Sequence, residues 1–268
     1  MESNRQDTEK PDSGKRRFLW LLLLLILVFA GSAYSVLNQL LDYADSRNGQ
    51  EEVKRQVIEK QAQAENQDER QGAGGKKPDR GKPPVKVDFK LLKESNSDVI
   101  GWLYIEALDI SYPILQGVDN QYYLHRNLDG AYEYSGSIFL DSKNSSDFKD
   151  CNSIIYGHNM ADASMFGRLK EFNLADAISI SPYVWVLTEE GDFRYKIFSA
   201  QVVTVTSECY TLFQDADSTF LEFMQRMNAN SNINTARENF TAENRVLTLS
   251  TCAGNGNDED RYVVQAVK

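Results

Sequence analysis

Cysteine and histidine are scarce in this sequence, which holds three cysteines and two histidines among 268 residues. A small and odd number of cysteines excludes a disulfide framework, so at least one thiol stays unpaired. The spacing leaves open a single bridge, between Cys151 and Cys209. Chemistry that needs a thiol or an imidazole therefore has few candidates in this chain.

Basic residues are in the minority in the C-terminal part of the chain. Residues 86–268 carry 15 Lys and Arg against 26 Asp and Glu, a net charge of −11, whereas residues 1–85 carry 14 against 13. An acidic domain repels phosphate backbones, which argues against a nucleic-acid partner. A basic or amine-bearing partner is electrostatically acceptable, and charge that only keeps the protein soluble explains the same excess.

Charged residues are absent from positions 18–37, FLWLLLLLILVFAGSAYSVL. At about 1.5 Å of rise per residue, this helix would span roughly 30 Å, the thickness of the hydrocarbon core of a bilayer. A basic cluster at 15–17 precedes it, so the positive-inside tendency places residues 1–17 in the cytoplasm and the rest of the chain outside. Small residues at 31–33 also suit a cleaved signal peptide, but the apolar character continues beyond them, which favours an uncleaved anchor.

The next part of the chain, residues 38–85, has few apolar residues. Residues 51–69 contain helix formers with few apolar anchors, which predicts a solvated helix or a stalk. Residues 72–84 combine Gly, Pro and charge and should be flexible. The sequence thus predicts a polar helical and flexible tether over residues 38–85, which holds a folded domain, residues 86–268, away from the membrane.

The C-terminal part carries the signals of a mainly β domain. After a short amphipathic helix at 87–94, β-branched and aromatic runs alternate with Gly, Asn and Asp turns, which is typical of an all-β barrel or sandwich. The predicted strands cover residues 101–105, 137–140, 152–156, 177–180, 184–187, 193–198, 201–205, 245–251 and 261–267. One longer helix is predicted at 217–227, where Asp217 caps the start and apolar side chains recur at i, i+3, i+4 and i+7.

The segment Thr-Leu-Ser-Thr-Cys at 248–252 closes one of these strands with a cysteine. Strand alternation places Leu247 and Leu249 on one face and Ser250 and Cys252 on the other. If the leucines fill the core, the cysteine points outward beside hydroxyl groups, which is unusual for a structural cysteine. The pattern leaves two interpretations open for Cys252, an inert thiol and a nucleophile.

The two histidines differ in their surroundings. His158 follows an apolar strand and a glycine, so its ring is presented at a strand end, where binding and catalytic sites are commonly built. His125 lies in Tyr-Leu-His-Arg-Asn, among residues typical of a solvated turn. We therefore expect a functional role for His158 and none for His125.

Arg261 begins the last strand, beyond a polar loop at 253–260. Pairing of the two strands would bring Arg261 next to Cys252, where a guanidinium group could hold a substrate carbonyl, stabilise an oxyanion and favour a thiolate. The alternative is a salt bridge between Arg261 and the acids of the loop. Those acids lack the ligand spacing of a calcium site, so no metal is predicted.

These motifs occur together in one known family, the sortases, and in particular resemble class B. The segments that carry the resemblance are Tyr-Gly-His-Asn-Met at 156–160, Ser-Met-Phe at 164–166, Thr-Leu-Ser-Thr-Cys at 248–252, Arg261, Asp-Phe-x-x-Leu at 88–92, Gly-Trp-Leu at 101–103 and Gly-Ser-Ile-Phe-Leu-Asp at 136–141. The resemblance covers roughly residues 86–268. It implies an eight-stranded sortase-like β-barrel with an N-terminal helix and a helix before the cysteine strand, in a membrane-tethered cysteine transpeptidase of Gram-positive bacteria.

The resemblance also implies a mechanism. Cys252 would attack the Thr carbonyl of a C-terminal pentapeptide sorting signal on a secreted protein and form a thioacyl enzyme. His158 would protonate the leaving amine and later deprotonate the incoming one, while Arg261 positions the substrate and stabilises the oxyanion. The acceptor would be an amine of a peptidoglycan precursor or of another protein. This chemistry needs no metal and no organic cofactor.

Several further positions match residues that line the substrate groove in class B. They are Asn120, Leu124, Thr206, Tyr210 and Ser250. The chain departs from the class pattern directly after the cysteine, where Ala253 stands in place of a frequent acidic residue. Two other functions stay open, a thiol hydrolase with the same fold and a membrane-tethered binding module whose thiol is idle.

Overall fold

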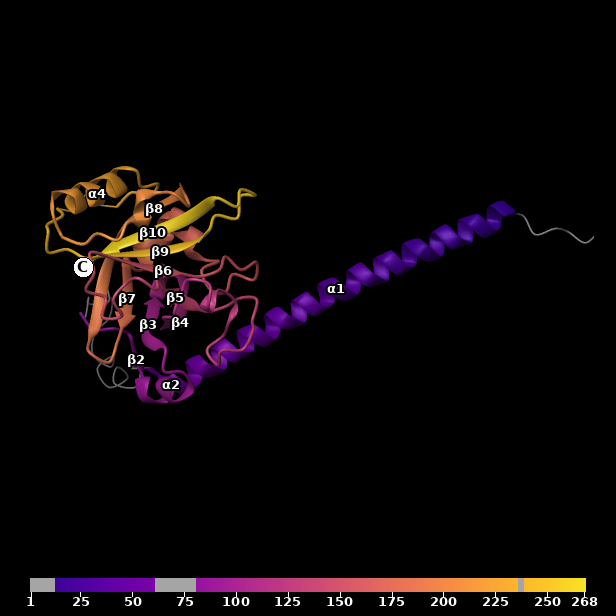
Figure 1. Cartoon of the computed structure of the whole chain (residues 1–268), viewed down its shortest axis with the longest axis horizontal. Helices are drawn as coiled ribbons and strands as arrows, with labels where there is room; N and C mark the ends of the chain where they lie inside the picture. The colour runs from indigo at the N-terminus through magenta and orange to yellow at the C-terminus, as the bar shows by residue number, and fades with distance from the viewer. Residues whose placement is uncertain (1–12, 61–80, 236–238) are drawn as a thin grey trace, which may run out of the picture. The chain divides into compact units, whose positions relative to one another are not determined.

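The structure is a computed structural model that describes residues 13–60, 81–235 and 239–268. Eight strands close into a barrel in the order β10, β8, β7, β3, β4, β5, β6 and β9 (Figure 1). Their bounds are β3 (Val99–Ile105), β4 (Ile110–Leu115), β5 (Ile138–Leu140), β6 (Asn152–Tyr156), β7 (Tyr183–Leu187), β8 (Asp192–Thr204), β9 (Val246–Cys252) and β10 (Asp260–Val267). The predicted mainly β, eight-stranded barrel is confirmed.

Two pairs of neighbouring strands in the barrel are parallel, β4 with β5 and β6 with β9. In the second pair, Tyr156 near the end of β6 lies opposite Ser250 of β9. Because parallel strands end at the same edge of a sheet, the residues that follow β6 and the last residue of β9 come together there. His158 and Cys252 therefore belong to one edge of the barrel.

The core is built from large apolar side chains of the strands. Trp102, Leu103, Ile155 and Tyr195 are fully buried. Burial of a side chain such as Leu or Ile contributes roughly 1.5–3 kcal/mol to stability. The indole Nε1 of Trp102 donates a hydrogen bond to Ser111 Oγ at 3.0 Å, so the polar edge of this ring is satisfied within the core.

The predicted long helix is α4 (Ser218–Ala229), which lies over one side of the barrel near β8 (Figure 1). Asp217 caps it, since its Oδ1 accepts hydrogen bonds from the backbone nitrogens of Thr219 and Phe220 at 2.9 and 3.2 Å. The four side chains of its apolar stripe are buried: Phe220, Phe223, Met224 and Met227. The capping residue and the i, i+3, i+4, i+7 pattern are both confirmed.

This helix changes the expected environment of β9. Val246 packs in the same cluster as the apolar stripe of α4, although strand alternation places it on the face opposite Leu247 and Leu249. All residues of β9 are buried except Cys252, which is exposed. The outward direction of Cys252 is therefore confirmed, while Val246 on the same strand face is covered by the cluster that includes α4.

Two predicted strands differ in the structure. Residues 177–180 were expected as a strand, yet they belong to the helix α3 (Ala175–Ile180), in which only Ala177 is buried among the four. Four residues are too few to separate a helical period from a strand period. The prediction of a strand rested on the two β-branched isoleucines of this segment, and it is wrong. The runs 193–198 and 201–205 form one continuous strand, β8, up to Thr204.

The sequence does not predict β4. This strand contains Pro113, which cannot donate a ladder hydrogen bond and therefore argues against a strand. Its parallel partner β5 is only three residues long and pairs at Ile114 and Leu115, past the proline. On the other side, Pro113 lies opposite Trp102 of β3.

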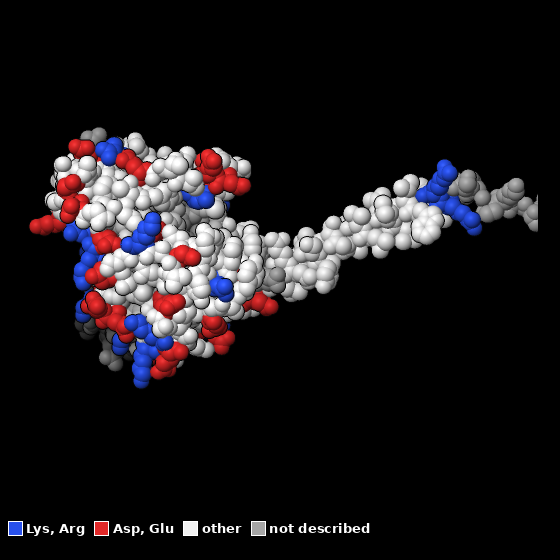
Figure 2. Space-filling model, viewed as in Figure 1, with Lys and Arg blue, Asp and Glu red and all other residues white. Residues whose placement is uncertain are grey.

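The N-terminal helix α1 runs over Ser13–Val57. It is the one helix in the described residues that is long and apolar enough to cross a membrane. Figure 2 shows an uncharged surface along residues 18–41 of this helix, with basic side chains before it. The contacts of the chain divide it into two compact units, residues 1–46 and 47–268.

The second unit includes part of the predicted tether. The helix α1 ends at Val57, which is 3% exposed and packs with Val85, Leu92 and Trp102. Two short strands, β1 (Ile58–Lys60) and β2 (Val85–Val87), then pair in antiparallel fashion, before the helix α2 (Phe89–Ser95). The sequence predicts a solvated segment from residue 51, whereas its C-terminal end in the structure packs against the barrel. The domain limits stay a prediction, because residues 61–80 lie outside the described part of the chain.

Candidate active site

The thiol of Cys252 differs from the other two in its exposure. Cys252 is exposed at the end of β9, while Cys151 and Cys209 are buried and unbridged. The bridge that the spacing left open does not form. Burial raises the pKa of the Cys209 thiol to about 11 and also raises that of Cys151. Cys252 is the accessible thiol of the chain.

The hairpin of β9 and β10 aligns Cys252 with Arg261, and the two residues are direct partners across the strands. The predicted neighbourhood of these residues is therefore present. The Nη1 of Arg261 donates hydrogen bonds to the backbone carbonyls of Asp258 and Asp260, at 2.7 and 3.0 Å. The alternative salt bridge with the loop acids is absent among the described residues, and backbone carbonyls hold the guanidinium instead.

The loop after β6 joins the same edge. Gly157 N donates to Ser250 O at 3.2 Å, which extends the parallel pairing by one residue beyond β6. Asn159 Nδ2 then donates to the carbonyl oxygen of Cys252 at 3.0 Å. His158 stands between these two bonds, so the parallel register brings its loop alongside the end of β9.

The ring of His158 has a defined hydrogen bond. Its Nε2 lies 2.8 Å from the carbonyl oxygen of Leu124. A carbonyl only accepts, so Nε2 carries the hydrogen and Nδ1 is the nitrogen left for proton transfer. Burial lowers the pKa of His158, the bond to Leu124 opposes this, and the nearby His125 lowers it further. The ring is therefore neutral at pH 7.

The sequence predicts His125 as a solvated turn residue without a role, whereas the structure places it half-buried beside His158. Its ring stacks on that of His158, with 5.1 Å between the centroids and 29° between the planes. The connection between β4 and β5 brings it there. Sequence reasoning missed this neighbour because residues 33 positions apart give no local signal of contact, and the flanking Arg126 and Asn127 are common in turns.

Three of the predicted groove residues belong to one line of contacts, made of hydrogen bonds and one ring stack. Asn120 Nδ2 donates to Asp141 Oδ2 at 2.8 Å, and the hydroxyl of Tyr156 donates to the same oxygen at 3.0 Å. The ring of Tyr156 stacks on Tyr210, whose hydroxyl lies 2.8 Å from Ser250 Oγ. The line thus connects three predicted residues through two that were not singled out, Asp141 and Tyr156.

The other two predicted groove residues lie outside this line. Leu124 is partly buried against the core cluster that includes Tyr123 and Phe139, and its carbonyl is the partner of His158. Thr206 is exposed just after β8, where its hydroxyl lies 3.1 Å from Thr204 Oγ1. Its neighbour Val205 donates to the carbonyl of Glu259 at 2.9 Å, so Thr206 lies next to the loop that holds Arg261.

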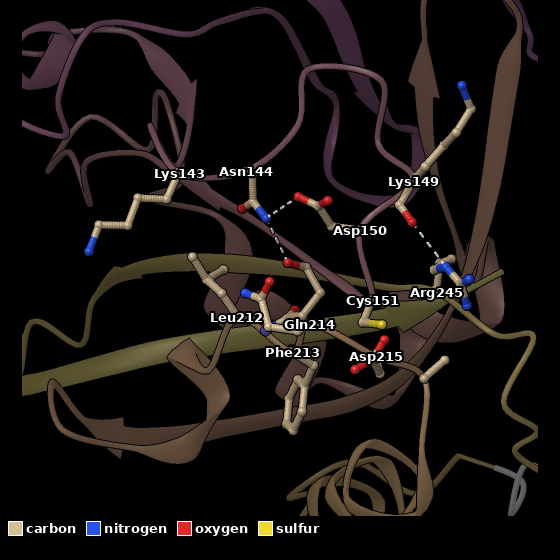
Figure 3. A pocket seen from close by; sticks show the side chains of 12 residues that line it. Lys143, Asn144, Lys149, Asp150, Cys151, Leu212, Phe213, Gln214, Asp215 and Arg245 are labelled. Atoms are coloured by element: carbon tan, nitrogen blue, oxygen red, sulfur yellow. Dashed lines mark hydrogen bonds between the residues drawn. The ribbon is translucent and has the colours of Figure 1, made fainter.

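A cavity of about 510 Å³ lies at the other ends of β6 and β9, near Asn152 and Arg245 (Figure 3). Its lining is mostly polar and includes Cys151. Arg245 Nε donates to the Lys149 carbonyl at 3.0 Å across one side of it. The candidate site at Cys252 is separate from this cavity. Among the described residues, no three His, Cys, Asp or Glu side chains are grouped so as to hold a metal ion.

Known proteins resemble this chain in both sequence and fold. The family described as Sortase domain matches residues 103–268. Sortase B of Listeria monocytogenes is 36% identical over 170 residues, which cover 63% of this chain and 68% of that protein. The structure of Clostridium perfringens sortase B has a TM-score of 0.62 and 32% identity, over 67% of this chain and 98% of that one. Sortase B of Bacillus anthracis, in complex with AAEK1, has a TM-score of 0.64 and 29% identity, over 85% and 98%.

The matched region spans the candidate site as well as most of the barrel. The matched region contains His158, Cys252 and Arg261, and it includes the parallel pair β6 and β9 that brings the first two to one edge. From the exposed thiol, the barrel and these relatives together, we conclude that the chain belongs to the sortase family of cysteine transpeptidases, and within it to class B.

Proposed function

We propose that this protein cleaves a C-terminal pentapeptide sorting signal after its Thr and transfers the secreted protein that carries it to an amine. The amine belongs to a peptidoglycan precursor or to another protein. The observation that carries this proposal is the exposed thiol of Cys252, in register with Arg261 and beside the loop of His158. Membership in class B supports the same reaction.

In the first half of the reaction, the thiol proton passes to Nδ1 of His158 and the thiolate sulfur of Cys252 adds to the Thr carbonyl carbon. The tetrahedral intermediate then collapses. The carbon–nitrogen bond breaks, the leaving amine takes the proton from His158, and a thioester remains on the enzyme. The neutral ring with a free Nδ1 suits the role of proton carrier.

In the second half, the acceptor amine attacks the thioester and gives its proton to His158 as the carbon–sulfur bond breaks. The products are an amide and the free thiolate, which regains a proton. Arg261 acts on the negative oxygen in both tetrahedral intermediates. Its two bonds to loop carbonyls hold the guanidinium beside the strand end, so little ordering is needed when the charge develops.

The sorting peptide lies along Asn120, Leu124, Thr206, Tyr210 and Ser250. Ser250 is 2% exposed and acts through Tyr210, whose hydroxyl it meets. The side chain of Asn120 already bonds to Asp141 and accepts from Ser142 N at 2.8 Å. The amide of Asn120 carries a second N–H, which can donate to a carbonyl of the peptide while the bond to Asp141 holds the side chain in place.

The N-terminal helix supports a place at the cell surface. Residues 18–37 anchor the chain in the membrane, with residues 1–17 in the cytoplasm and the barrel outside. Residues 38–85 connect the anchor to the catalytic domain. A full-length chain in the membrane fraction supports this topology, and a mature form that begins near Tyr34 contradicts it.

The test is to incubate the full-length enzyme in detergent with a sorting peptide and an amine. The peptide comes from a secreted protein of the same genome that ends in a pentapeptide, an apolar stretch and a basic tail. Mass spectrometry should detect an amide between peptide and amine, and the variants Cys252→Ala, His158→Ala and Arg261→Ala should lose it. Cys151→Ala, remote from the site, serves as the thiol control. Cleavage that ignores the amine indicates a hydrolase, and activity in Cys252→Ala indicates an idle thiol.

A further inference from the structure

The ring of His158 is held by more than its hydrogen bond. One hydrogen bond, from Nε2 to the Leu124 carbonyl, fixes the tautomer but leaves the ring free to turn about the line between the two atoms. A flat neighbour against its face removes that freedom. His125, which follows Leu124 directly in the chain, provides this neighbour at 5.1 Å between centroids.

His125 is itself held in place by Tyr134. Its Nδ1 lies 3.1 Å from the carbonyl oxygen of Tyr134, so Nδ1 carries a hydrogen and donates. The ring of Tyr134 stacks on His125 at 5.9 Å and on His158 at 6.1 Å. The three rings thus form a triangle of aromatic contacts, with two of its corners on the connection between β4 and β5.

We propose that His125 is a positioning residue for His158, which holds the plane of the imidazole so that Nδ1 points toward the thiol of Cys252. This inference rests on the proposed function, in which His158 carries the proton. Successive residues supply the two restraints, since Leu124 fixes the tautomer and His125 fixes the plane. If the imidazole rotates so that Nδ1 moves away from the thiol, proton transfer becomes slower. A misplacement of about 1 Å costs up to about 100-fold in rate.

The rings alone make the contact, so a flat apolar ring should replace His125. We expect His125→Phe to keep kcat/KM within about threefold of the parent and His125→Ala to lower it about 10- to 100-fold, mainly through kcat. Tyr132→Ala is the matched control, because the centroid of the Tyr132 ring lies 6.1 Å from that of His125 and Tyr132 is 76% exposed. It should leave the rate unchanged.

A second readout does not depend on activity. The chain has two histidines, so ¹⁵N-histidine spectra of the full-length His125→Phe protein in micelles report His158 alone. We expect the Nε2–H tautomer in His125→Phe. We expect a mixture of tautomers in His125→Ala, because a ring without its flat neighbour can also swing away from the Leu124 carbonyl that selects the Nε2–H form. Thermal unfolding of each variant identifies loss of the fold.

The outcomes separate this inference from the proposed function. Equal rates in His125→Ala and the parent overturn the positioning role, and so do equal losses in His125→Ala and His125→Phe together with an unchanged tautomer. If His158→Ala and Cys252→Ala keep the transfer activity, the proposed function itself is wrong. The tautomer comparison still tests whether His125 orients the ring in that case.

Discussion

At the scale of single residues, Gly136 determines whether the Leu124 carbonyl can keep its position. Gly136 has φ of +57°, and a Cβ at this position would lie 2.2 Å from the Leu124 carbonyl oxygen. That oxygen accepts from His158. The glycine therefore provides both a left-handed turn and the space that lets the carbonyl keep its partner.

We predict that Gly136→Ala lowers both stability and transfer activity. The backbone strain alone costs about 1–2 kcal/mol, and displacement of the Leu124 carbonyl adds to it and releases the ring of His158. Gly130→Ala is the matched control, since Gly130 has φ of +77° with nothing within 4 Å of its Cβ position. It should show the strain in chemical denaturation and keep kcat. Equal kcat in the two variants would contradict the role of the carbonyl.

A pair of glycines in the loop after Cys252, Gly254 and Gly256, allows the effect of backbone strain to be separated from the effect of a steric contact. A Cβ on Gly254 would lie 2.7 Å from Asn159 Nδ2, the donor to the Cys252 carbonyl, whereas nothing lies within 4 Å of the Cβ position of Gly256. Both have positive φ. We predict that Gly254→Ala weakens the bond to Cys252 and lowers the rate at least about tenfold, while Gly256→Ala does not. Single-turnover acylation measures this directly, and similar rates in both would rule out the contact.

At the scale of elements, the sequence predicted what is locally encoded. The helix α4 follows from Asp217 and its apolar stripe, and the hairpin register that aligns Cys252 with Arg261 follows from two strands and a short loop. The strand β4 was not predicted because Pro113 within it argues against a strand. Contacts between distant segments, such as His125 on His158, depend on how the barrel closes, and no local pattern records them.

The docking of the end of α1 is another such contact, and it makes a prediction at this scale. Val57 is buried with Val85, Leu92 and Trp102. We expect Val57→Ala to lower the free energy of unfolding of the full chain by roughly 1.5 kcal/mol, because two methyl-sized groups leave the core. Val118→Ala, at a side chain 89% exposed, is the control and should change little. Urea unfolding followed by tryptophan fluorescence measures both, and equal midpoints would mean that this end of α1 does not hold in solution.

At the scale of the whole molecule, the site and the stability of the fold are linked through one proton. Burial holds the pKa of His158 below its ordinary value of 6.5. As the pH falls below 6.5, the unfolded chain binds a proton that the folded chain refuses, so the free energy of unfolding decreases until the folded pKa is passed. Above pH 6.5 this contribution to stability is complete.

His158→Gln removes this proton and keeps an amide donor for the Leu124 carbonyl. We therefore predict that the melting temperature of the full chain falls less steeply from pH 6.5 to pH 5 in His158→Gln than in the parent. Other groups that titrate in this range affect both proteins alike, so the difference between the two curves isolates His158. Calorimetry of both proteins in the same detergent provides the curves. Parallel curves would show that the ring of His158 is not buried in solution.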